Sequence, residues 1–123
     1  MRDKINIKWL DEPEEHNYPA AVSYLSLIYA EATANDLVEK LRAAKISGFK
    51  AKDILRASSL TLLGINNAHV EKDRKKIEDG VALSPILLTR DTQNGKVIIA
   101  DGYHRVCAIY SLAEDAVIPC KIV

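Results

Sequence analysis

The feature that most constrains how this chain folds is a pair of short apolar runs separated by a turn dipeptide. Residues 85–89 (PILLT) and 96–100 (KVIIA) are rich in Ile, Leu and Val, as buried strands are. Asn94-Gly95 lies between them, and this pair favours the tight turn of a hairpin because both residues tolerate positive φ. We therefore predict two strands joined as a β-hairpin.

A helical pattern follows the hairpin at once. Apolar side chains at Val106, Ile109, Tyr110 and Ala113 recur at i, i+3, i+4 and i+7, which predicts a helix over residues 103–112. Residues 116–123 are predicted to form a last strand. At the other end of the chain, residues 5–9 alternate apolar and polar side chains, which predicts a half-buried strand.

The middle of the chain shows helical patterns. One helix is predicted to begin at Pro19 and continue to Tyr29, and a second to begin at a Thr33–Asp36 capping pair and end at Ser47-Gly48. A short helix is expected over residues 51–57. A charged helix over residues 68–79, capped by Asn66 or Asn67, is expected to end at Gly80. Helices and strands sharing one core predict an α+β fold, with α/β as the alternative.

Composition narrows the function classes. The 123 residues include 17 Lys and Arg and 17 Asp and Glu, so the formal net charge is +0. This balance offers no bulk attraction to nucleic acid or to anionic membranes. We expect a single cytoplasmic domain with no membrane partner, and we expect Cys107 and Cys120 to be reduced, packed thiols.

The turn from the second hairpin strand into the following helix is the candidate site. Residues 101–105 (DGYHR) place a glycine, a histidine and an arginine at a helix start, where free N–H groups and the helix dipole favour anions. Arg105 supplies a fork suited to phosphate, and His104 a proton donor or acceptor. Asp101 is expected to cap the helix, with metal binding as the alternative. His104 and Arg105 could equally serve capping and ion pairing.

These residues also carry a family resemblance. Asp101 to Arg105 followed by Ala108 resembles the D-G-x-H-R-x-x-A signature of the ParB/sulfiredoxin-like superfamily, and residues 84–88 (SPILL) resemble its "P-I-x-V" strand. The resemblance covers residues 68–123 and leaves residues 18–66 as a helical elaboration. It implies a small mixed sheet and a nucleotide such as ATP, ADP or CTP, with Mg²⁺, bound by residues 101–105, namely Asp101, Gly102, Tyr103, His104 and Arg105.

The sequence differs from individual branches of that superfamily, and these differences limit which of their activities we expect here. Sulfiredoxins have a catalytic cysteine directly before the His-Arg pair, where this chain has Tyr103, and Cys107 is expected to be inert. Partition proteins continue into a helix-turn-helix region, which we do not expect here, so DNA binding would require another domain. A ParB-like nuclease would need carboxylates that hold a metal; the candidates are Asp101, Glu14, Glu15 and Glu71.

The sequence therefore predicts a phosphate-ligand site, with phosphoryl transfer or nucleotide hydrolysis as the chemistry if the protein is an enzyme. His104 and Arg105 are the candidate catalytic residues, and Glu71 or Glu15 could resemble the acidic base of the family's serine-kinase branch. The rival hypothesis is a non-catalytic module that binds a protein partner or a second copy through residues 18–66 and keeps a vestigial anion site. Trp9, Tyr18, Tyr24 and Tyr29 are expected to serve the core.

Overall fold

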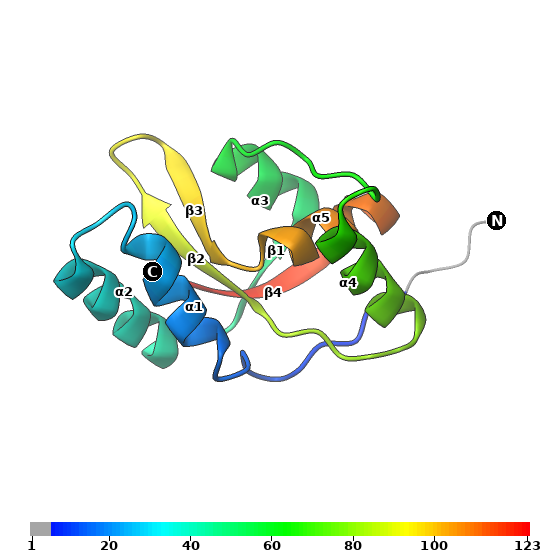
Figure 1. Cartoon of the computed structure of the whole chain (residues 1–123), viewed down its shortest axis with the longest axis horizontal. Coiled ribbons are helices and arrows are strands. Elements are labelled where there is room, and N and C mark those ends of the chain that lie inside the picture. Colours follow the sequence, from blue (N-terminus) through cyan, green and yellow to red (C-terminus); the bar gives the residue numbers. More distant parts are fainter. Residues whose placement is uncertain (1–5) are drawn as a thin grey trace.

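The fold is α+β, as predicted. The computed structural model describes residues 6–123, so Ile5 of the predicted first strand lies outside the described residues. In the described part, helices and strands are interspersed along the chain (Figure 1). Their order is α1 Asn17–Leu25, α2 Glu31–Ala43, β1 Ser47–Lys50, α3 Ala51–Ser58, α4 Ala68–Glu78, β2 Ile86–Asp91, β3 Lys96–Asp101, α5 Tyr103–Leu112 and β4 Val117–Ile122.

A mixed sheet forms the centre of the molecule, with the strand order β1-β4-β2-β3. β2 and β3 make the predicted antiparallel hairpin, in which Leu88 pairs with Ile99 and Arg90 with Val97. β4 returns after α5 to lie parallel to β2, and β1 pairs antiparallel with β4 at the edge. Because β4 comes back between β1 and β2, the last residues of the chain tie both halves of the sheet together.

Each face of the sheet carries its own apolar core. α1 and α2 cover one face and bury Tyr18, Leu25 and Leu41 against Leu87 and Ala100. α3 and α5 cover the other face, with α4 packed against α5, as Figure 1 shows. The alternation of side chains along β2 divides Leu87 and Leu88 between the two cores. Helices from both parts of the chain therefore meet at the sheet.

One buried lysine links the N-terminal loop to the last strand. Lys121 is 1% exposed, and its Nζ donates a hydrogen bond to the carbonyl of Arg42 at 2.8 Å. The same nitrogen lies 3.1 Å from a carboxylate oxygen of Glu12. A buried ammonium requires such partners. The contact holds residues 11–16 against the end of α2.

Several local predictions were correct. The hairpin, α3 and α5 lie where the patterns placed them, and Asn67 caps α4 by accepting hydrogen bonds from the N–H groups of His69 and Val70. α4 ends at Glu78, just before Gly80. Both cysteines are free and buried, and burial raises the pKa of the Cys120 thiol to about 12.

Other boundaries were wrong. α1 begins at Asn17, before Pro19, whose missing N–H falls in the first turn where it costs no helical bond. The Thr33–Asp36 capping pair does not exist, because α2 starts at Glu31 after Ala30. α2 ends at Ala43, before the predicted end at Ser47-Gly48, and Ser47 and Gly48 instead pair with β4 as part of β1.

The predicted first strand is reduced to one contact. Within residues 6–9, only Trp9 forms a bridge, to Leu83. Tyr18 is in the core, as expected of the aromatic residues, whereas Tyr24 is 40% exposed.

Candidate functional site

The site is built where β3 passes into α5, and Gly102 makes that passage. Its φ is +112°, a value that side chains other than hydrogen rarely permit. A Cβ at this position would lie 2.4 Å from Cδ1 of Ile86, so the space is closed as well. Gly102 therefore lets the chain turn sharply over β2, and α5 begins at the next residue with its first N–H groups free of helical partners.

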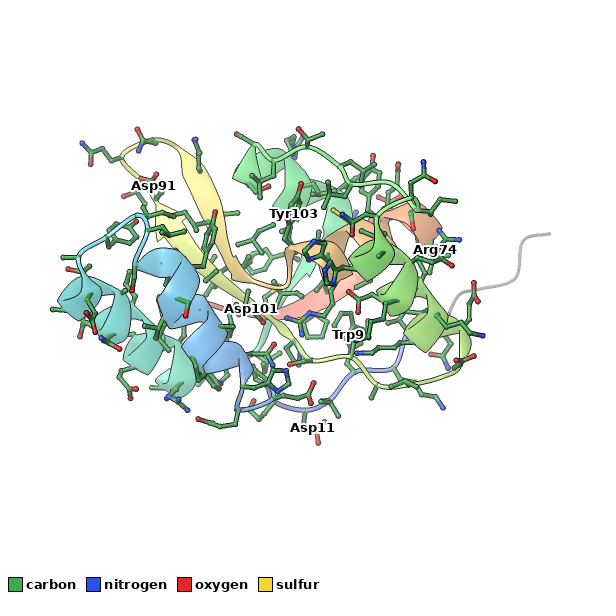
Figure 2. The ribbon with its side chains drawn as sticks, viewed as in Figure 1. Trp9, Asp11, Arg74, Asp91, Asp101 and Tyr103 are labelled. Carbon is green, nitrogen blue, oxygen red and sulfur yellow. The ribbon has the colours of Figure 1, made fainter. Side chains whose placement is uncertain are left out.

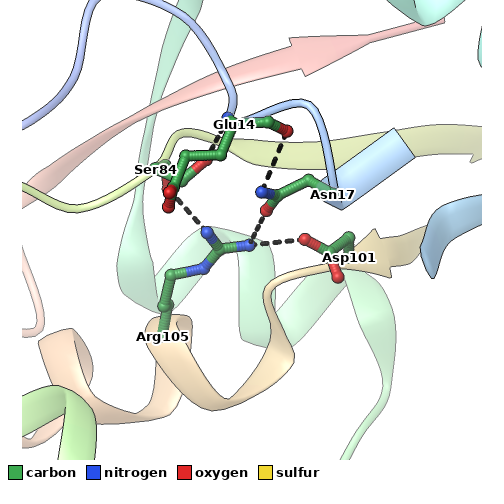
Figure 3. A network of polar contacts seen from close by, with 5 residues as sticks. All are labelled: Glu14, Asn17, Ser84, Asp101 and Arg105. Carbon is green, nitrogen blue, oxygen red and sulfur yellow. Dashed lines mark hydrogen bonds and ion pairs between the residues drawn. The ribbon is translucent and has the colours of Figure 1, made fainter. Parts of the chain in front are cut away.

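Arg105 is the centre of a polar network beside this turn (Figure 3). One terminal nitrogen donates to the carbonyl of Ser84 at 3.1 Å, and the other donates to Oδ1 of Asn17 at 2.9 Å and to Oδ2 of Asp101 at 2.7 Å. Only 14% of the Arg105 side chain is exposed. The fork predicted to hold phosphate is thus already occupied by three acceptors of the protein.

Asp101 does not cap α5, contrary to the expectation. The N-cap residue is Gly102, and no side chain caps the helix. The Asp101 carboxylate turns to Arg105 instead, because a buried guanidinium so close offers a stronger partner than the helix N–H groups do. Burial raises the pKa of Asp101, while the charge of Arg105 acts in the opposite direction.

A polar cleft of about 330 Å³ opens on the α4 side of this turn. All three histidines of the chain, His16, His69 and His104, line it. With neutral imidazoles the cleft has two cationic and three acidic side chains, a net charge of −1. The charged members are Glu14, Asp73, Lys76, Asp101 and Arg105.

His104 is the side chain of this cleft best placed for proton transfer. Its ring centroid lies 4.8 Å from that of His69. Burial lowers the pKa of His104, the neighbouring His69 lowers it further, and Asp73 opposes them. Burial also raises the pKa of Asp73. An imidazole kept neutral beside a carboxyl group can accept a proton at neutral pH.

An apolar cleft of about 410 Å³ opens on the other side of the same turn. Ala20 and Tyr24 of α1 form one wall, and Leu60 with Tyr103 another. The Tyr103 hydroxyl donates a hydrogen bond to the carbonyl of Thr61, which ties the loop after α3 to α5. Asp101 and Tyr103 lie near the middle of the molecule in Figure 2. The two clefts share Asp101, Gly102 and His104.

Two predicted acidic residues do not reach the site. Glu71 is exposed and lies beside Arg74 on the outer face of α4, and Glu15 forms an ion pair with Arg42 at 2.7 Å. Neither of these two carboxylates lines the polar cleft. Asp73 and Glu14, which are close to them in sequence, line the polar cleft instead. The i, i+4 spacing of His69 and Asp73 on a helix was the available signal.

Sequence reasoning missed His16 and Asn17 as site residues because they come from a loop and a helix start that are far from residues 101–105 in sequence.

No protein-family model, curated protein or solved structure matches the chain. Within residues 6–123, no helix is long and apolar enough to cross a membrane. The same stretch has no group of three or more His, Cys, Asp or Glu side chains arranged to hold a metal ion.

Proposed function

We propose that this protein binds a nucleotide across the turn from β3 to α5. The observation that carries the proposal is the junction of a polar and an apolar cleft at Gly102. A nucleotide has the same two-part chemistry, an apolar planar base and an anionic phosphate chain. The resemblance of residues 68–123 to the ParB/sulfiredoxin-like superfamily supports the same ligand class.

The base belongs in the apolar cleft and the phosphates in the polar one. Tyr24 presents a partly exposed aromatic ring in the first cleft, and aromatic rings stack well on planar bases. On the polar side, the free N–H groups at the start of α5, with His104 and Lys76, offer donors to phosphate oxygens. Arg105 serves as a positioning residue that fixes the turn.

The charge of the polar cleft favours a nucleotide that arrives with Mg²⁺. A net charge of −1 repels a bare polyphosphate, whereas Glu14 and Asp73 could share an ion with the phosphates. Magnesium is commonly bound in this way, by one or two carboxylates and the substrate, rather than by a cage made of protein alone. The ion would neutralise phosphate charge.

Phosphoryl transfer or hydrolysis is the chemistry that this arrangement serves best. A neutral His104 beside Asp73 can take the proton from an attacking hydroxyl or water, and the α5 N–H groups can stabilise charge on the transferred group. The Cys that sulfiredoxins need is replaced by Tyr103. For the nuclease alternative, two of the four candidate carboxylates, Glu15 and Glu71, lie outside the polar cleft, and a third, Asp101, is paired with Arg105.

Calorimetric titration with ATP, ADP, CTP and GTP, each with and without Mg²⁺, tests the proposal. We expect micromolar binding of one nucleotide, lost in His104→Ala and weakened about tenfold in Tyr24→Ala, the range for one stacked base. Lys45→Gln, an exposed position outside both clefts, is the control. Absence of binding for every nucleotide in both conditions would refute the proposal.

One observation favours the interaction-module alternative. Around the end of α1, Leu27 is 83% exposed and Ile28 is 48% exposed, close in sequence to Tyr24, whose side chain is also exposed. Neighbouring apolar side chains in water are typical of contact surfaces. Leu27→Asp should abolish self-association or partner capture if residues 18–66 serve this role, and light scattering of the purified protein measures the self-association.

A further inference from the structure

A second apolar cleft lies at the opposite end of the β2–β3 hairpin from Gly102. Its volume is about 510 Å³, and it shares no lining residue with the two clefts at α5. The sheet forms its floor with Phe49, Leu88, Val97 and Ile122, and Ile54 of α3 forms a wall. The cleft therefore lies between α3 and the four strands of the sheet.

The floor of this cleft is incompletely covered. Phe49, Val97 and Ile122 pack against the core and are still only half-buried. Their exposed apolar surface gains free energy on contact with an apolar ligand, in proportion to the area removed from water. The cleft is also large enough for a small organic molecule, as ligand sites of comparable volume are.

Positive charge marks the rim of the cleft. Arg90 and Lys96 line it at the hairpin end, and neither forms an ion pair with any described residue from 6 to 123. The acidic lining residue Asp53 is already paired with Arg56 at 2.9 Å. Asp91, the neighbour of Arg90, accepts hydrogen bonds from Asn94. The rim of this apolar cleft therefore carries two cationic side chains that form no ion pair within residues 6–123.

We propose that this cleft binds an amphipathic organic anion of the fatty-acid class. The hydrocarbon chain lies along Phe49, Leu88 and Val97, and the carboxylate meets Arg90 and Lys96 at the rim. The combination of apolar walls and a few charged groups that fix orientation is the usual composition of a small-molecule site. This site does not depend on nucleotide binding, since the two regions share no residue.

Titration of the ¹⁵N-labelled protein with decanoate, below the concentration at which it forms micelles, tests the proposal. We expect saturable shifts of the amide signals of Phe49, Val97 and Ile122, while His104 and Tyr103 stay unchanged. Decyltrimethylammonium has the same chain with the opposite charge and should bind at least tenfold more weakly. Equal affinity for the two amphiphiles, or shifts centred on α5, would overturn the proposal.

Two variants test the charged rim and the apolar interior of the cleft separately. Arg90→Gln with Lys96→Gln should weaken decanoate binding about three- to tenfold, as expected for two exposed charge pairs. The control, Lys45→Gln with Lys72→Gln, removes the same charge from exposed positions elsewhere and should bind normally. Ala57→Phe fills the hollow from an exposed position on α3 and should abolish binding without unfolding the protein. Decanoate affinity that is unchanged in either cleft variant would contradict the site.

Discussion

The carboxylate of Asp101 and the guanidinium of Arg105 lie 2.7 Å apart across the first turn of α5, and both are largely buried. Their contact connects the end of β3 to the helix that follows it. The same guanidinium reaches Asn17 at the start of α1 and the Ser84 carbonyl before β2 (Figure 3). The Arg105 side chain therefore supports the fold at the point where the candidate site is formed.

Arg105→Ala is expected to destabilise the protein by about 2–4 kcal/mol, because it leaves the buried Asp101 carboxylate without its partner. Urea unfolding measures the loss. Arg56→Ala is the control, since Arg56 is 83% exposed and its pair with Asp53 should contribute less than about 1 kcal/mol. Equal stability of the two variants would contradict a structural role for Arg105. Loss of nucleotide binding in Arg105→Ala alone would not identify a phosphate contact.

Gly102→Ala is expected to cost about 2–4 kcal/mol, the sum of an unfavourable φ and a collision with Ile86. Ile86→Val in the same chain should recover part of this loss by making room, and thermal unfolding of the single and double variants measures it. Gly64→Ala is the control, because nothing lies within 4 Å of a Cβ there and its φ is not positive. An additive double variant would show that the Ile86 contact contributes nothing.

Lys121→Met is expected to reduce the free energy of unfolding by about 1–3 kcal/mol. Met keeps the apolar stem but leaves the carbonyl of Arg42 without its donor. Lys40→Met provides the comparison, because that ion pair with Asp36 is more than half exposed on both sides. Chemical denaturation should separate the two variants clearly; a Lys121→Met protein as stable as Lys40→Met would show that the buried ammonium is dispensable.

Asp73→Asn is expected to raise the melting temperature at pH 7. Burial raises the pKa of Asp73 above its usual 3.8, so the folded state holds the proton more tightly than the unfolded chain does. The contribution of this group to stability is then complete below about pH 3.8 and falls as the pH rises through the folded-state pKa. The advantage of Asp73→Asn should therefore vanish near pH 3, and an advantage that persists there would have another origin.

His104 is expected to titrate below pH 6.5, since burial and the adjacent His69 lower its pKa. Because folding favours the neutral ring, the stability that it contributes is present above pH 6.5 and is lost as the pH falls through its folded-state pKa. NMR of the imidazole protons measures this midpoint. His69→Gln should move the midpoint upward by removing the neighbouring charge, and an unchanged midpoint would show that His69 does not influence His104.

Local sequence patterns were sufficient to predict most of the secondary structure in the C-terminal third of the chain. The hairpin and α5 follow from short-range rules, namely apolar runs, a turn dipeptide and helical spacing, which act between residues close in sequence. The predicted turn of residues 101–105 likewise forms as a strand-to-helix junction. The predicted end of the second helix was wrong because strand pairing between distant segments sets the structure there. β1 forms where Ser47 and Gly48 pair with β4, which is far along the chain.

What the sequence determined by itself was the hairpin, the last strand, the approximate positions of the helices and the presence of a glycine turn before a helix bearing His and Arg. Only the tertiary structure decided how these residues are used. It turned Asp101 from a cap into the partner of Arg105, and it brought His16 and Asp73 beside His104 from elements far apart in the sequence. Side-chain pairing depends on which segments the sheet and helices bring together, and one-dimensional spacing does not contain that information.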